Sequence, residues 1–290
     1  MNKYIYFHVC CINNWKSVVG NIFIKIKDSG LYEDISEIRC SVIGDVDEFL
    51  NLYLSIFGHD QKIKVLFNSN DPKLMESNFI ADRDPVHNEQ IILNHLYNDS
   101  LTSDFFVLYI HSKGVKRVRN RPELNSKLIR ALRTSSIRNT GLEEFIVNKH
   151  NNIVDCIEDW VDYLLHFNLY RKEDVYRYLE EYDTVGVNLL HFKNSSKTYT
   201  SGYSYNGNFW WSKSSYIRLL NRALDNVYCG PEWWITQKPG KFVSLYSSFV
   251  EHYKERYHPS NYETSDNKVL IGTKDIQQFH KDLEVLNEHR

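Results

Sequence analysis

Three short motifs combine residue types that can bind or transform a substrate. The first is His111-Ser112-Lys113-Gly114, which directly follows six apolar residues. Lysine supplies positive charge, and serine with the local backbone N–H groups supplies hydrogen-bond donors, so the set suits a diphosphate. The imidazole of His111 could also ligate a divalent metal ion. The alternative interpretation is an ordinary polar turn whose glycine adopts a positive φ.

The second motif is Gly207-Asn208-Phe209-Trp210-Trp211. An asparagine amide can hydrogen-bond to sugar hydroxyls, and indole faces can pack on pyranose rings. The alternative is a core strand, rich in aromatic residues, that follows a flexible loop. If the two tryptophans lie on a strand, their side chains face opposite sides, so at most one of them can face a ligand.

The third motif is Gly230-Pro231-Glu232-Trp233-Trp234. A carboxylate between a turn and two tryptophans is partly desolvated, which raises its pKa and suits a general base. Glu232 is therefore the candidate catalytic residue. The alternative is a helix start, with proline in the first turn and an acidic residue favoured by the helix dipole. Both interpretations can hold at once.

The elements that must position these motifs follow from hydrophobic periodicity. Predicted strands cover residues 4–11, 38–43, 63–67 and 105–110, and predicted helices cover 15–29, 47–57 and 89–97. Continuous apolar strands separated by helices predict a parallel sheet that is covered on both faces. Ligands of such sheets bind at the carboxyl ends of the strands. The candidates there are Asn13 after the first strand, Asn68 after the third, and the His111 motif after the fourth.

The second half of the chain is more helical. Helices are predicted between residues 124 and 182, strands over 184–190 and 242–246, and a closing amphipathic helix over 274–286. We expect one α/β domain, Rossmann-like, with a mostly parallel central sheet flanked by helices. It should span residues 1–256 and be followed by a C-terminal extension, residues 257–290.

Composition excludes several classes of function. The chain has 290 residues, with 35 Lys and Arg against 37 Asp and Glu, so the formal net charge is −2. A protein that binds duplex nucleic acid usually has a basic surplus, which is missing here. The sequence has no apolar run long enough to span a membrane. It also lacks Gly-x-Gly-x-x-Gly and Walker-type motifs, which argues against a dinucleotide dehydrogenase and a P-loop NTPase.

The cysteines indicate a reducing compartment. There are five, an odd number, and no two of them form a Cys-x-x-Cys motif. This pattern argues against a disulfide framework and against a zinc ribbon. We therefore expect a cytoplasmic protein, or one of the host cytoplasm if its source is viral.

Taken together, the motifs resemble the GT-A-fold glycosyltransferase-like proteins of large DNA viruses and bacteria, similar to the chlorella-virus sugar transferase domain. The resemblance covers roughly residues 4 to 250. It rests mainly on Tyr109-Ile110-His111-Ser112-Lys113-Gly114-Val115 and on Gly207-Asn208-Phe209-Trp210-Trp211. Shorter blocks support it, such as Tyr182-Asp183-Thr184-Val185-Gly186 and Glu232-Trp233-Trp234-Ile235.

The resemblance implies a glycosyltransferase that takes a nucleotide-sugar, with a UDP-sugar as first candidate, and a glycan or other hydroxyl acceptor. Residues 1–114 would bind the donor and residues 115–256 the acceptor. The donor residues would be Asn13 and Asn68 near the nucleoside, with His111, Ser112 and Lys113 on the diphosphate. The residues framing the sugar and acceptor would be Asn208, Trp210, Trp211 and Trp233, with Glu232 as the base.

One departure from the family pattern bears on the cofactor. Most GT-A enzymes carry Asp-x-Asp at the end of the fourth strand, where it holds Mn²⁺ or Mg²⁺ with the diphosphate. Here that position reads His111-Ser112-Lys113. The cation of Lys113 could replace part of the metal's role by neutralising the leaving diphosphate. The sequence therefore leaves two questions open: whether a divalent cation is needed, and whether the protein is instead a non-catalytic nucleotide-sugar- or glycan-binding protein that retains the fold.

Overall fold

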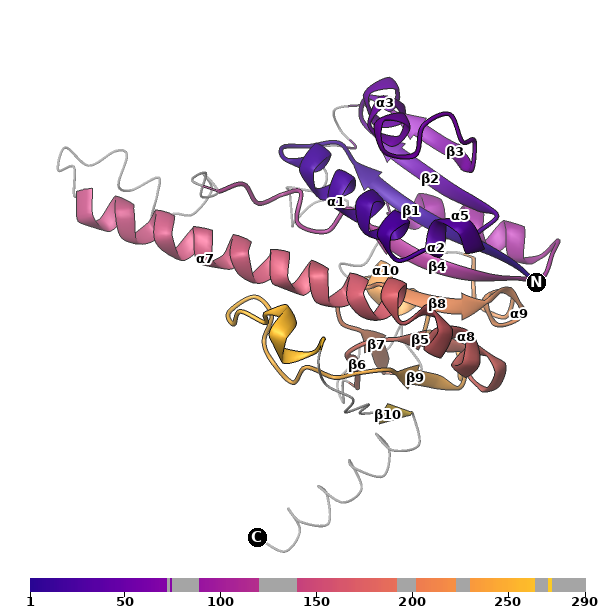
Figure 1. The fold of residues 1–290 in the computed structure, drawn as a ribbon. Helices are drawn as coiled ribbons and strands as arrows, with labels where there is room; N and C mark the ends of the chain where they lie inside the picture. The colour runs from indigo at the N-terminus through magenta and orange to yellow at the C-terminus, as the bar shows by residue number, and fades with distance from the viewer. Residues whose placement is uncertain are drawn as a thin grey trace, which may run out of the picture.

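The computed structural model describes residues 1–71, 74, 89–119, 140–191, 202–222, 230–263 and 271–272 (Figure 1). Within these residues, a central sheet of eight strands lies between two layers of helices, in the order β10-β9-β5-β8-β4-β1-β2-β3. This confirms the predicted α/β class with a mostly parallel central sheet. The sheet strands are β1 (Asn2–Cys10), β2 (Glu37–Ile43), β3 (Ile63–Ser69), β4 (Phe105–His111), β5 (Thr184–Gly186), β8 (Trp210–Lys213), β9 (Phe242–Ser244) and β10 (Ile271–Gly272).

The N-terminal strands form the parallel part of the sheet. β1 pairs in parallel with both β2 and β4, and β2 pairs in parallel with β3. β1 is buried from Tyr4 to Cys10 because helices cover both of its faces, as its continuous apolar sequence predicts. β8 is inserted antiparallel between β4 and β5. The carboxyl ends of β1 and β4 therefore lie side by side next to the start of β8.

Two hydrophobic cores flank the sheet. The first core packs α1, α3, α7 and α8 on one face, and the second packs α5, α9 and α10 on the other. The described helices are α1 (Trp15–Asp28), α2 (Leu31–Asp34), α3 (Val46–Phe57), α5 (Glu89–Ser100), α7 (Thr140–Leu165), α8 (Lys172–Glu181), α9 (Ser214–Ile217) and α10 (Gly230–Trp234). α7 continues into a π-helical turn over His166–Tyr170.

The alternation of side chains along β8 places its two tryptophans in different cores. Trp211 lies in the first core, where its Nε1 donates to the carbonyl of Asn168 at 2.9 Å. Trp210 lies in the second core, stacked on Tyr109 with ring centroids 5.0 Å apart. The expectation that the pair occupies a strand, with opposite orientations, is confirmed.

The predicted strand over 184–190 is divided in the structure. β5 ends at Gly186, and Asn188 then adopts a left-handed conformation with φ 50°. The chain continues as β6 (Leu189–His191), which pairs with β7 (Tyr203–Tyr205) in a separate two-stranded sheet. The left-handed turn at Asn188 separates the two segments and directs the second one out of the main sheet.

The segment after β9 returns along α7, coloured orange to yellow in Figure 1. Arg256 donates from Nη2 to Asp159 of α7 at 2.9 Å, and the backbone N–H of Tyr257 donates to the same carboxylate at 3.1 Å. The closing helix expected over 274–286 lies outside the described residues, and the domain boundaries stay a prediction. No helix in the described part of the chain is long and apolar enough to cross a membrane.

The burial of Trp211 predicts its contribution to stability. Trp211→Ala removes a fully buried indole and should lower the free energy of unfolding by about 3–5 kcal/mol, measured by urea denaturation. Ile24→Ala, at a half-exposed position of α1, is the control and should change it by about 0.5 kcal/mol or less. A loss below about 1 kcal/mol for Trp211→Ala would contradict its place in the core.

Candidate functional site

The carboxyl ends of β1 and β4 are tied together by polar contacts. His8 of β1 stands in register with His111 of β4, so their side chains point to the same face. The hydroxyl of Ser112 accepts the backbone N–H of Cys10 at 2.9 Å. Asn13 adopts φ 51° and donates from Nδ2 to the carbonyl of Val115 at 3.1 Å. Ser112 and Asn13 thus fix the two loops that leave the strands, and their expected contacts with a ligand stay predictions.

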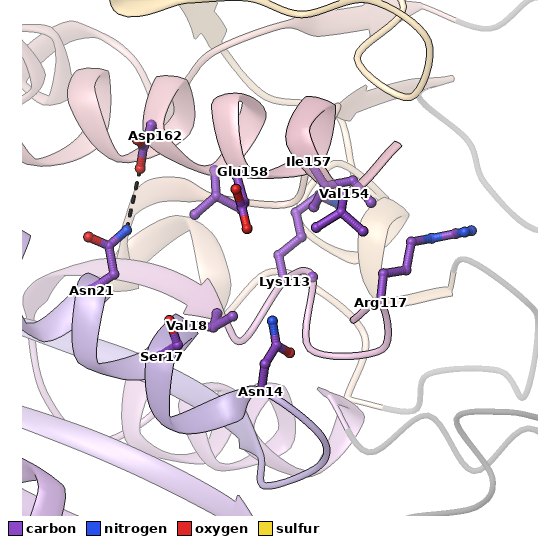
Figure 2. A pocket seen from close by; sticks show the side chains of 12 residues that line it. Asn14, Ser17, Val18, Asn21, Lys113, Arg117, Val154, Ile157, Glu158 and Asp162 are labelled. Carbon is purple, nitrogen blue, oxygen red and sulfur yellow. Dashed lines mark hydrogen bonds between the residues drawn. The ribbon is translucent and has the colours of Figure 1, made fainter. Parts of the chain in front are cut away.

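A cavity of about 310 Å³ opens beside these strand ends, on the face of the first core (Figure 2). Three elements line it: the start of α1, the turn after β4 and the middle of α7. The lining residues are Asn14, Ser17, Val18 and Asn21 from α1 and its N-cap, Lys113, Gly114 and Arg117 from the turn, and Val154, Ile157, Glu158, Val161 and Asp162 from α7. Lys113 belongs to the His111 motif, and Arg117 lies in the loop that follows it.

The electrostatics of this cavity favour an anion. The N-terminus of α1 carries the positive end of the helix dipole, and the first turn of this helix contains no acidic residue. Lys113 and Arg117 add two cationic side chains. The acidic residues of the wall form ion pairs: Glu158 with Arg119 at 2.5 Å, and Asp162 with Lys25 at 3.4 Å.

Trp160 of α7 holds the ammonium group of Lys113. The Nζ atom lies 3.9 Å from the centre of an indole ring, which is a cation–π contact. His252 stacks on the same tryptophan with ring centroids 5.2 Å apart and planes 3° from parallel. Burial, followed by the charge of Lys113, lowers the pKa of His252 to about 4. The charge of Lys113 therefore affects the pKa of a buried histidine on this face of the sheet.

A carboxylate cluster occupies the other face of the same strand end. Glu89, the first residue of α5, accepts on Oε2 from the hydroxyl of Tyr109 at 2.8 Å and from Nδ2 of Asn208 at 3.0 Å. Its Oε1 lies 3.8 Å from Nδ1 of His111, whose Nε2 lies 3.2 Å from the carbonyl of Gly207. The Glu89 side chain is 27% exposed, so the cluster reaches solvent.

The charges of this cluster keep the carboxyl group ionised. Burial alone would raise the pKa of Glu89, but His111, His8, the Tyr109 hydroxyl and Lys113 together hold it at about 2. Burial lowers the pKa of His111, and Lys113 adds to that effect while Glu89 opposes it. Burial likewise lowers the pKa of His8 to about 4. The cluster at neutral pH is an anion surrounded by neutral imidazoles and hydrogen-bond donors.

Three of the predicted sugar-binding residues turn out to be structural. Trp210 and Trp211 are 0% exposed, so neither ring can stack on a ligand, and that part of the expectation is wrong. Asn208 is 1% exposed, and both ends of its amide are used, because Nδ2 binds Glu89 and Oδ1 accepts from Trp210 Nε1 at 2.9 Å. The motif places Glu89 and closes the second core instead of contacting a sugar.

Glu232 and Trp233 lie on α10. Glu232 is exposed, so the expected desolvation of its carboxylate is wrong, whereas the helix-start interpretation is confirmed. Its charge acts on Tyr109, whose pKa is raised first by burial and then by Glu89 and Glu232. Glu232 therefore lies near the cluster, and its role as a base stays a prediction. Trp233 is half-buried, and its contact with an acceptor also stays a prediction.

Asn68 lies apart from the other candidates. It is exposed and belongs to β3 itself, where it pairs with Val42 of β2, because the strand runs to Ser69 and not only to residue 67. Two strands, β1 and β2, separate β3 from β4 in the sheet. The structure thus brings together His111, Ser112, Lys113 and Asn208, with Glu232 nearby, but not Asn68.

Sequence reasoning missed Glu89, His8, Arg117 and Trp160. Glu89 begins a predicted helix, but 119 residues separate it from Asn208, and no local spacing encodes that contact. His8 carried a usable signal, because it is a polar residue inside an otherwise apolar strand.

In the described part of the chain, no three His, Cys, Asp or Glu side chains come close enough together to bind a metal ion. Both ring nitrogens of His111 already face partners, Glu89 and Gly207. The chain also has an Asp-x-Asp sequence, Asp82-Arg83-Asp84, which lies outside the described residues. The need for Mn²⁺ or Mg²⁺ stays a prediction.

No model of a known protein family matches the chain, and no curated protein matches it. Two solved structures are similar to it. HddC from Yersinia pseudotuberculosis has a TM-score of 0.40 and 10% identity, covering 91% of this chain and 97% of its own. The 4-diphosphocytidyl-2C-methyl-D-erythritol synthase from Anaerococcus prevotii has a TM-score of 0.29 and 12% identity, covering 75% of this chain and 73% of its own. Similarity at this level carries no functional conclusion.

The depressed pKa of Glu89 predicts a pH dependence of stability. A carboxyl group whose pKa falls on folding stabilises the protein above its unfolded value, near 4.5, and this contribution disappears as the pH falls through about 2. Its upper limit is about 3 kcal/mol. Glu89→Gln should remove it, so wild type and variant should differ in urea stability at pH 6 and converge near pH 2. A difference independent of pH would contradict the ionised state of Glu89.

Proposed function

We propose that this protein is a glycosyltransferase that moves a sugar from a nucleotide-sugar, with a UDP-sugar as the first candidate, to a hydroxyl of a glycan or other acceptor. One observation supports this above the others. A cationic cavity at the start of α1 and a partly buried, ionised carboxylate cluster lie on either side of the end of one strand, β4. A nucleotide-sugar needs both charges, because its diphosphate is negative and its anomeric carbon becomes positive during transfer.

The diphosphate would bind in the cavity. Lys113 and Arg117 supply cations there, and the N-terminus of α1 adds the positive end of its helix dipole. Asn14 carries a buried Oδ1 that has no hydrogen-bond donor within the described residues, and it could accept from an N–H or O–H group of the nucleoside. The resemblance of the His111 motif to GT-A proteins agrees with this placement.

The sugar would face the carboxylate cluster. Oε1 of Glu89 has His111 as its neighbour at 3.8 Å, whereas Oε2 is held by two hydrogen bonds. Lys113, which would bind the diphosphate, also lies close enough to the cluster to lower the pKa of Glu89. A fixed carboxylate at this position would stabilise positive charge on the anomeric carbon, since hydrogen bonds already orient it and little rearrangement is needed.

The transfer is a substitution at the anomeric carbon of the sugar. The acceptor oxygen forms a bond to the anomeric carbon, and the bond from that carbon to the diphosphate oxygen breaks. The electron pair leaves with the diphosphate, whose charge Lys113 and Arg117 neutralise. Glu232 takes the proton of the acceptor hydroxyl in an inverting reaction. An exposed carboxylate on a five-residue helix is accessible to an incoming acceptor.

The second candidate is a binding protein that retains the fold without the chemistry. The feature that favours it is the sequence His111-Ser112-Lys113 at the end of β4, where most GT-A enzymes carry Asp-x-Asp. Release of nucleoside diphosphate from a panel of nucleotide-sugars, with and without Mn²⁺, separates the two. Turnover supports the transferase, and saturable binding without turnover supports the binding protein.

The cavity predicts the effect of removing its lysine. Lys113→Ala should weaken the binding of a nucleoside diphosphate by about 1.5–3 kcal/mol, the contribution of a charged hydrogen bond, which is roughly 10- to 100-fold in Kd. Isothermal titration calorimetry with UDP measures it. Lys64→Ala, at an exposed position of β3, is the matched control and should leave Kd unchanged. Equal Kd values for Lys113→Ala and wild type, with the fold intact, would reject the assignment.

The proposed base gives a separate prediction. Glu232→Gln keeps the volume of the side chain but removes its ability to take a proton, so kcat for transfer should fall by about 100-fold or more. Donor binding should stay the same. Glu33→Gln, at an exposed position of α2, serves as the control. A near-normal kcat for Glu232→Gln would assign the base to another residue.

A further inference from the structure

The segment 245–262 presents two large exposed aromatic side chains. It follows β9 and runs along α7 (Figure 1). Phe249 is 80% exposed and Tyr253 is 47% exposed. The solvent-facing surface of these two rings contributes nothing to either core and offers an apolar face to a ligand. A contact with something outside the described chain would account for them.

The backbone at Phe249 is strained. Its φ is 56°, in the left-handed region that glycine tolerates and a bulky side chain disfavours. Such a conformation persists only where the surroundings impose it, and strained residues of this kind gather at binding sites. The structure shows what imposes it here.

A buried polar network holds the residues around Phe249. The backbone N–H of Ser248 donates to Oδ1 of Asn188 at 2.9 Å, and Tyr163 donates its hydroxyl to the same oxygen at 2.9 Å. The hydroxyl of Ser248 lies 2.7 Å from Nε2 of His252, which is itself 3.1 Å from Nδ2 of Asn188. All four side chains are buried. Such a network rigidifies a loop, so Phe249 is presented in one fixed position.

Tyr253 adjoins the proposed donor site through Trp160. The ring of Tyr253 meets Trp160 edge-on at a centroid distance of 5.1 Å, and the ammonium of Lys113 lies 3.9 Å from a ring of the same tryptophan. A single side chain therefore separates Tyr253 from the residue assigned to the diphosphate. A group bound on Tyr253 would be a neighbour of the donor.

We propose that Phe249 and Tyr253 form the platform on which a sugar ring of the acceptor binds. The proposal rests on the proposed function and adds to it the acceptor class, a carbohydrate. Aromatic faces pack against the C–H surface of a pyranose. Glu251 and Lys254, exposed on the same turn, offer partners for its hydroxyls. Because the loop is already rigid, binding costs little ordering.

Binding of methyl glycosides tests the proposal directly. The probes are the methyl pyranosides of glucose, galactose, mannose, xylose and rhamnose, observed by saturation-transfer NMR in the presence of UDP. The variants are Phe249→Gly, Tyr253→Ala and the conservative Phe249→Tyr, with Leu219→Ala, at another exposed apolar position, as the control. UDP binding by calorimetry is measured for each.

At least one glycoside should bind wild type, about tenfold more weakly to Phe249→Gly and Tyr253→Ala, and normally to Phe249→Tyr and Leu219→Ala. Phe249→Gly should also unfold at an equal or higher urea concentration, because glycine relieves the positive φ. A residue kept for stability would show the reverse. UDP affinity should be the same throughout.

Two results would overturn the proposal. One is that wild type binds UDP but none of the glycosides. The other is that a glycoside binds Phe249→Gly and Tyr253→Ala as well as it binds wild type. In both cases, binding of UDP would still support the proposed donor site. If wild type does not bind UDP at all, the result would instead reject the proposed function.

Discussion

The parallel pairing of β1 with β4 is the constraint on which the rest of the site depends. It brings His8 beside His111 and lets Ser112 bind the end of β1. β4 ends at His111, which joins the carboxylate cluster on one face of the sheet, and the turn that follows carries Lys113 to the cavity on the other. A shift of this pairing by one residue would exchange the two faces and separate the charges.

The cavity on one face of the sheet and the carboxylate cluster on the other are also coupled electrostatically. Lys113 helps to keep Glu89 ionised and His111 neutral. A diphosphate that neutralised Lys113 would weaken this effect and favour the proton on His111.

Much of the fold could be predicted from the sequence, but only part of the site. Apolar runs broken by amphipathic helices suffice for a parallel sheet, and the position after a strand suffices to single out Lys113. The contact of Glu89 with Asn208 could not be predicted, because it joins α5 to the loop before β8 across 119 residues. The burial of Trp210 and Trp211 was ambiguous for another reason: an aromatic ring suits a core and a ligand equally well. Only the packing of α7 and α10 on the two faces of β8 decides it.

A crystal of the protein soaked with UDP would test the central claim most directly. The account predicts electron density for the diphosphate between the start of α1 and α7, with phosphate oxygens within hydrogen-bond distance of Lys113 Nζ and the Arg117 guanidinium. It also predicts that the Lys113 ammonium leaves the indole of Trp160 to meet the phosphate. Density for UDP at another place, or an empty cavity at a concentration that saturates binding in solution, would contradict it.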